Sequence, residues 1–177
     1  MNADFNLASA CISVHRRFRL LCGLCIFRKG TRMHSDSDWK INLQALEKQK
    51  LTLMVIKDGT LLFSSGKRGI TPLVDLLEAN MNDLVGTTVV DRVVGVAAAK
   101  LLLWQHVQRI DALFATRPAV DLLRHSGIKL NHRTLVPRLV DPKTGRQDHY
   151  EAMSIKYDYP ELFYRAVREE LLIFHQA

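Results

Sequence analysis

The sequence predicts an α/β domain in which helices cover a mixed sheet of about five strands. Asp58-Gly59 joins two apolar, β-prone runs and favours a tight hairpin, so the sheet is expected to start antiparallel. After this hairpin, helical and strand-like segments alternate three times, which is typical of parallel strands joined by right-handed crossovers. The 177 residues, 47% apolar and 24% charged, fit one domain with one sizeable core.

The first helix and the hairpin follow from local signals. Ser37 or Asp38 can cap a helix, because apolar residues recur after them at roughly helical spacing. Residues 51–56 and 60–64 are the two β-prone runs on either side of the turn. We therefore expect a short helix followed by an antiparallel pair.

The next three elements continue the alternation. Thr71-Pro72 combines a capping hydroxyl with proline at the first helical position, which predicts a helix over 71–78. Residues 87–90 form a short β-branched run typical of a strand. Residues 95–106 are rich in Ala and Leu, so they are expected to form a buried helix.

The remaining elements complete the domain. We expect a strand over 109–115, a helix over 118–125 that ends at Gly127, and a strand over 128–132. Prolines and a glycine then mark a loop region. Residues 160–174 show the spacing of an amphipathic helix that packs on the body.

This order of elements is similar to that of the cytidine deaminase-like fold. Three stretches more closely resemble a domain-of-unknown-function family, numbered 1893, that belongs to that superfamily; these are Lys67–Leu73, Val90–Ala98 and Arg117–Val120. The resemblance spans roughly residues 45–140 and implies a three-layer α/β/α sandwich. On this basis residues 1–37 are expected to be a basic, disordered extension, 38–145 the cytidine deaminase-like domain, and 146–177 a C-terminal loop and packing helix.

The resemblance also shows what this chain lacks. In the deaminases, a His or Cys two residues before a Glu begins the second core helix, and Pro-Cys-x-x-Cys begins the third, where zinc activates a water. The corresponding positions here are Gly95-Val96-Ala97 and Pro118–Leu122, which contain no zinc ligand and no proton carrier. We therefore expect no zinc-dependent deamination, no catalytic residue of that mechanism, no metal and no cofactor.

The candidate ligand site combines basic loops with helix starts. A helix N-terminus beside cations suits a phosphate or carboxylate, although the 66–69 loop lacks the spacing of a Walker loop. Asp91-Arg92 and Thr116-Arg117 are expected directly after strands, at the edge where ligands of α/β sheets bind. The alternatives are a solvated turn and ion pairs that tie loops together. The candidate ligand-binding residues are Lys67, Arg68, Gly69, Thr71, Asp91, Arg92, Gly95, Thr116 and Arg117.

The N-terminal segment concentrates both basic residues and cysteines. Residues 1–32 contain six Arg and Lys against one Asp, which leaves +2 of the net charge of +7 for residues 33–177. A disordered extension, a mitochondrial-type targeting peptide and a metal or redox pair at Cys22 and Cys25 are all consistent with this segment. The absence of Cys from 33–177 excludes a disulfide-stapled fold, and no apolar run reaches the length of a membrane span, so a cytoplasmic location is expected.

Three functions remain open. The first is a non-catalytic binding domain for a nucleotide-like or otherwise phosphorylated small molecule. The second is a zinc-independent enzyme or group carrier that uses Asp91 as a base and Arg92 as electrostatic stabiliser. The third is a protein-interaction or regulatory module that uses its C-terminal helix and basic tail as contact surfaces. The sequence is consistent with a homo-oligomer. Membrane association is not expected, and nucleic acid is not expected as a partner because the body carries little net charge.

Overall fold

A computed structural model describes residues 38–80 and 84–174; the sequence predictions for the first 37 residues, Cys22 and Cys25 included, lie outside these ranges. The elements are α1 (Asp38–Lys48), β1 (Leu53–Lys57), β2 (Thr60–Ser65), α2 (Thr71–Asn80), β3 (Thr88–Val94), α3 (Val96–Trp104), β4 (Arg109–Thr116), α4 (Arg117–Leu123), β5 (Lys129–Val136), α5 (His149–Ile155) and α6 (Pro160–Phe174).

The five strands form one mixed sheet in the order β2-β1-β3-β4-β5. β1 pairs antiparallel with both β2 and β3, whereas β3, β4 and β5 are parallel. Asp58 and Gly59, at the hairpin turn, both adopt positive φ, as a tight turn of this kind requires. The expected fold class, an α/β domain with an antiparallel first hairpin, is thereby confirmed.

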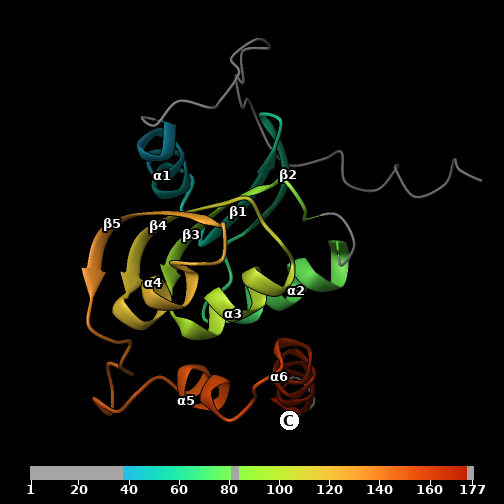
Figure 1. The fold of residues 1–177 in the computed structure, drawn as a ribbon, viewed down its shortest axis with the longest axis vertical. Helices are drawn as coiled ribbons and strands as arrows, with labels where there is room; N and C mark the ends of the chain where they lie inside the picture. Colours follow the sequence, from blue (N-terminus) through green and yellow to red (C-terminus); the bar gives the residue numbers. More distant parts are fainter. Residues whose placement is uncertain (1–37, 81–83, 175–177) are drawn as a thin grey trace, which may run out of the picture. The chain divides into compact units, whose positions relative to one another are not determined.

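Helices cover both faces of the sheet (Figure 1). α1 packs on one face, where Leu43 and Leu46 meet Met54, Val90 and Leu113. α2, α3 and α4 lie on the other face over the larger apolar core, and α5 and α6 pack against these helices from outside. The arrangement is compatible with a three-layer α/β/α sandwich with an added outer pair of helices.

Three elements differ from the sequence expectation. β5 runs from Lys129 to Val136, four residues beyond the expected end of the strand over 128–132. β3 runs to Val94, so Asp91 and Arg92 lie inside the strand and do not follow it. Its pairing with β4 continues to Ala115, which keeps the backbone extended through Asp91, a residue of low strand propensity. The segment expected to be loop contains the seven-residue helix α5, whose N-cap Asp148 accepts hydrogen bonds from the amides of Tyr150 and Glu151.

Candidate functional site

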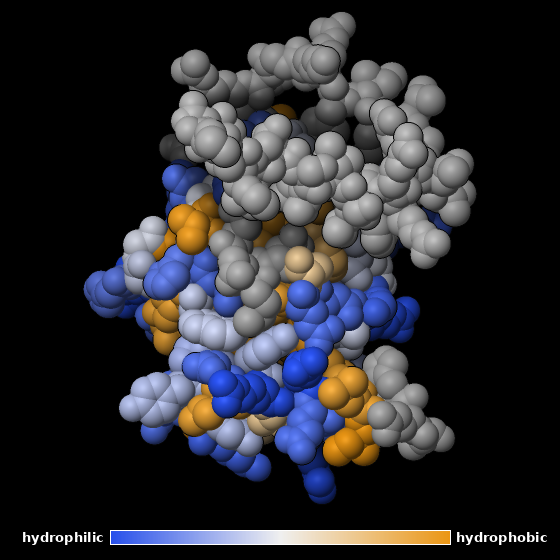
Figure 2. Space-filling model, turned by 90° about the vertical axis from the view of Figure 1, so that its right-hand side faces the viewer, coloured by the Kyte–Doolittle hydropathy of each residue, from blue (hydrophilic) through white to orange (hydrophobic). Residues whose placement is uncertain are grey.

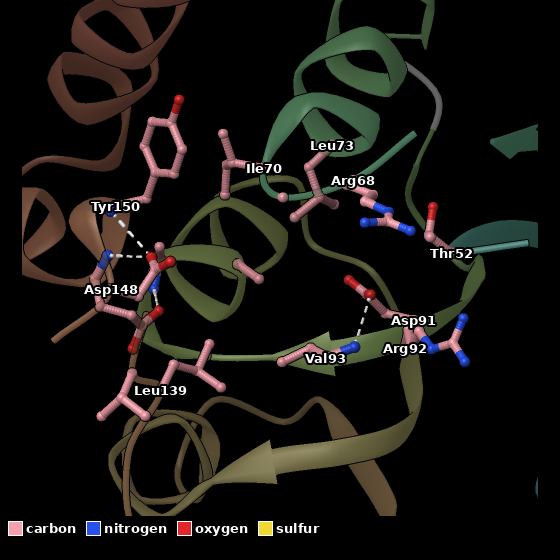
Figure 3. Close-up of a pocket in the computed structure, with 16 residues that line it drawn as sticks. Thr52, Arg68, Ile70, Leu73, Asp91, Arg92, Val93, Leu139, Asp148 and Tyr150 are labelled. Atoms are coloured by element: carbon pink, nitrogen blue, oxygen red, sulfur yellow. Dashed lines mark hydrogen bonds between the residues drawn. The ribbon is translucent and has the colours of Figure 1, made fainter. Parts of the chain in front are cut away.

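An open cleft of about 560 Å³ lies over the carboxyl half of β3, between the loop before α2, the start of α3, and α5 (Figure 3). This volume is in the range of small-molecule sites. Its lining residues are Thr52, Arg68, Gly69, Ile70, Leu73, Asp91, Arg92, Val93, Gly95, Ala97, Ala98, Leu139, Val140, Asp148, Tyr150 and Glu151. The cleft therefore combines an apolar floor with a small number of charged groups.

The structure brings five of the nine candidate residues to this cleft: Arg68, Gly69, Asp91, Arg92 and Gly95. Arg68 and Gly69 come from the loop before α2, whereas Asp91, Arg92 and Gly95 come from one continuous stretch of β3 and the cap of α3. The order of the strands in the sheet brings the basic loop and the carboxyl half of β3 to one cleft. The role of these residues in binding stays a prediction.

The other four candidates lie outside the lining. The Lys67 ammonium is 2.8 Å from Asp75 on α2, so it forms an ion pair with this helix and does not line the cleft. Thr71 is the first residue of α2 and does not border the cleft. Thr116 is fully buried and caps α4 by accepting the Ala119 amide at 3.3 Å, while Arg117 is exposed. The cleft that contains Asp91 and Arg92 is therefore not lined by Thr116 or Arg117.

Asp91 is a carboxylate placed in an apolar row of the sheet. It pairs in register with Leu53 of β1 and Ala112 of β4, and both of these belong to the larger core. Residues paired across strands share a face, so the carboxylate points toward α2 and α3. It is 9% exposed and borders the cleft, where the Arg68 side chain extends toward it (Figure 3).

Burial dominates the chemistry of Asp91. It raises the pKa of this carboxyl from 3.8 to about 7, although hydrogen bonds from the amides of Val93 and Arg92 partly oppose the shift. The Val93 amide lies 3.1 Å from Oδ1. Near neutral pH the group therefore exchanges between a neutral acid, which can donate a hydrogen bond, and a carboxylate, which accepts one.

The second buried carboxylate of the cleft belongs to Glu151, which the sequence analysis missed. Its two oxygens accept hydrogen bonds from the amides of Val96 at 3.0 Å and Ala97 at 2.9 Å, the first two residues of α3. The contact spans more than 50 residues of sequence and satisfies two amides that a helix start leaves unpaired. Burial raises the pKa of the Glu151 carboxyl; the two amides oppose this, and the charge of Asp148 adds to it.

The side chain of Glu151 also leaves no space for a side chain at position 95. A Cβ at Gly95 would lie 2.2 Å from Oε1 of Glu151 and 2.8 Å from Cδ1 of Leu139. The Glu151 carboxylate therefore occupies the amino terminus of α3. The cationic side chains of the cleft that are left for a ligand anion are those of Arg68 and Arg92. A pattern in the sequence, Asp148-x-x-Glu151, resembles a helix-capping signal and could have revealed α5.

The starts of α3 and α4, where the sequence resemblance would place zinc motifs, contain no His, Cys or Glu at Gly95-Val96-Ala97 or Pro118–Leu122. α3 begins at Val96 and α4 at Arg117, directly after the parallel neighbours β3 and β4. Within residues 38–80 and 84–174, no cluster of three or more His, Cys, Asp or Glu is placed to hold a metal ion.

In the same part of the chain, no helix has both the length and the apolar character of a membrane span.

These features define an α/β protein with an open, charged cleft at the carboxyl half of a central strand. The chain belongs to the family described as "TM1506: Domain of unknown function (DUF1893)", which matches residues 41–171. It is similar to the crystal structure of a DUF1893 family protein (TM1506) from Thermotoga maritima, with a TM-score of 0.68 and 26% identity over 80% of this chain and 95% of that chain. No curated protein matches the chain significantly. The expected family is confirmed, and its description assigns no activity.

Proposed function

We propose that this domain is a non-catalytic binding module for a nucleotide-like or otherwise phosphorylated small molecule, held in the cleft over β3. The observation that carries the proposal is the opposition of Asp91 and Arg68 across one cavity of about 560 Å³. A guanidinium at the mouth suits an anionic group, and a buried carboxyl suits N–H donors such as those of a nucleobase edge. The apolar floor around Ile70 and Leu73 suits the flat body of such a ligand.

Kinship with the cytidine deaminases is part of this proposal. The neighbouring starts of α3 and α4 support it, since each directly follows one of two parallel strands. The residues Gly95-Val96-Ala97 and Pro118–Leu122 supply no zinc ligand there, so a retained cleft without its metal favours binding over hydrolysis. The cytoplasmic location expected from the sequence stays a prediction.

Ligand-induced stabilisation tests the proposal. The full chain is screened by thermal shift against nucleotides, nucleotide sugars, sugar phosphates and inorganic phosphate. We expect a rise in Tm with at least one organic phosphate, because a ligand that binds only the folded state stabilises it. Arg68→Ala should abolish this rise.

Lys67→Ala is the matched control, since Lys67 is the adjacent cation but pairs with Asp75 outside the cleft. It should leave the ligand-induced rise unchanged. Equal losses in Arg68→Ala and Lys67→Ala would show that general charge, and not the cleft, attracts the ligand. A flat response to the whole panel would contradict the proposal.

A zinc-independent enzyme is the second candidate, and the pKa of Asp91 near 7 favours it, since a general base works best near the operating pH. The two functions are separated by incubating the stabilising ligand with the chain and examining it by mass spectrometry. Turnover that is lost in Asp91→Asn would establish an enzyme. A ligand that is recovered intact, with its affinity dependent on Arg68, would establish a binding module.

A further inference from the structure

The outward face of α6 carries large apolar side chains that the described part of the chain does not cover. Leu162 is 47% exposed, Leu172 is 52% exposed and Ile173 is 63% exposed. The opposite face of the same helix is buried in the larger core through Phe163 and Val167. Figure 2 shows the side of the domain on which α6 lies in Figure 1. In the lower part of this view, apolar side chains are exposed among charged ones.

The exposed residues are arranged symmetrically along the helix. Leu162, Arg165, Glu169 and Leu172 recur at intervals of three and four, so they form one stripe on the surface. Leucines stand at the two ends of the stripe, about 15 Å apart at 1.5 Å per residue. Between them stand one cation and one anion, about 6 Å apart along the axis. In chain order, the stripe therefore consists of an apolar residue, a cation, an anion and a second apolar residue.

Such a stripe is complementary to its own reversed copy. When two α6 helices lie antiparallel, Leu162 of one copy meets Leu172 of the other, and Arg165 meets Glu169. Both contacts occur twice about the two-fold axis, as an isologous interface requires. A parallel pair would instead bring Arg165 against Arg165 and Glu169 against Glu169, which like charges disfavour.

We propose that a second copy of this chain docks on α6, antiparallel about a two-fold axis at the middle of the helix. Both charged residues of the stripe are accessible to a second copy. Among the described residues, Arg165, with a 69% exposed side chain, forms an ion pair only with Glu161 of its own helix, and Glu169 forms none. This proposal is independent of the ligand cleft. An interface made mainly by one helix of 15 residues is small, so the dimer is in dynamic exchange with the monomer.

Charge reversal distinguishes this geometry from any other. Sedimentation of the full chain over a range of concentrations should show an average mass that rises from 20.2 kDa toward twice that value. Arg165→Glu alone and Glu169→Arg alone place like charges opposite each other twice, so each should weaken self-association by roughly ten-fold or more. A one-to-one mixture of the two single variants should restore association as a heterodimer, and the double variant should restore it as a homodimer.

Arg124→Glu at the C-cap of α4 is the matched control, because Arg124 is also an exposed arginine paired with an acid of its own segment, Asp121. It should dimerise like the unchanged chain, and circular dichroism should show that every variant is folded. An unchanged chain that stays monomeric at all concentrations would overturn the proposal. Single variants that dimerise normally would overturn it too, as would a mixture that stays monomeric.

Discussion

The carboxylate of Glu151 lies directly against Gly95, where a Cβ would approach Oε1 to 2.2 Å. The same carboxylate accepts hydrogen bonds from the two amides that follow Gly95. Glu151 thereby binds α5 to the start of α3, and the residues of this contact line one side of the cleft.

Gly95→Ala should therefore destabilise the fold. The backbone of Gly95 has φ −97°, which any residue adopts, so the cost comes from the lack of space. We expect the free energy of unfolding, measured by urea titration, to fall by about 1–3 kcal/mol. Gly66→Ala is the control, because the nearest atom to its Cβ would be 3.8 Å away. Equal free energies of unfolding for the two variants would show that α5 moves away from position 95 without loss of stability, and would contradict the prediction.

Glu151→Gln should loosen α5. The amide side chain has one acceptor oxygen, and its NH₂ group would face one of the two backbone donors of α3. We expect a loss of about 1–3 kcal/mol in the free energy of unfolding, with faster hydrogen exchange at the amides of Val96 and Ala97. Glu161→Gln, on the exposed side of α6, should leave exchange at both amides unchanged. Unaltered exchange in Glu151→Gln would refute the role assigned to this carboxylate.

Asp91 should make stability fall as the pH rises. The carboxyl titrates near 3.8 when unfolded and at about 7 when folded, so between these values the folded state binds more protons. The stability that Asp91 contributes through its raised pKa is fully present below about pH 4 and is lost as the pH rises through 7. Asp91→Asn cannot ionise, yet its oxygen can still accept the Val93 amide.

The variant should therefore be the more stable protein at about pH 8, by roughly 1–3 kcal/mol, and this advantage should vanish near pH 4. Urea titrations across this range measure the difference, and Asp121→Asn on the surface of α4 is the control. A constant difference between Asp91→Asn and the unchanged chain at all pH values would mean that Asp91 titrates normally.

The sequence predicted the order of the strands and helices because those elements carry local signals. The Asp58-Gly59 turn, the Thr71-Pro72 start and the Ala-rich α3 each depend on neighbours in sequence. β3 was predicted too short because Asp91 has low strand propensity, and its pairing with Leu53 of β1 and Ala112 of β4 is a long-range contact that holds the backbone extended.

The candidate site was predicted only in part for a related reason. Arg68 lines the same cleft as Asp91 and Gly95 because the sheet order brings the loop after β2 near β3, which alternation of strands and helices can indicate. The contact of Glu151 with α3 depends on the path of a loop and a short helix, for which periodicity gives no signal. Which of two adjacent cations, Lys67 or Arg68, lines the cleft is decided by the ion pair to Asp75.

On the other face of the sheet, Asp111 should be the most sensitive polar residue. It is fully buried and accepts hydrogen bonds, each of 2.8 Å, from Asn42 of α1, Arg109 of β4 and Asn131 of β5. Among the described residues, Nη2 of Arg109 is buried without a hydrogen-bond partner, so Asp111 is the group that compensates this guanidinium.

Asp111→Ala leaves the Arg109 charge buried and unpaired, so we expect the free energy of unfolding to fall by about 3–5 kcal/mol. The double variant Arg109→Met/Asp111→Leu should lose less, because two apolar side chains leave no charge to compensate. Asp121→Ala, which breaks an exposed ion pair with Arg124, should cost no more than about 1 kcal/mol. If the double variant proves less stable than Asp111→Ala, these hydrogen bonds contribute more than relief of the unpaired charge, and the network itself holds α1 on the sheet.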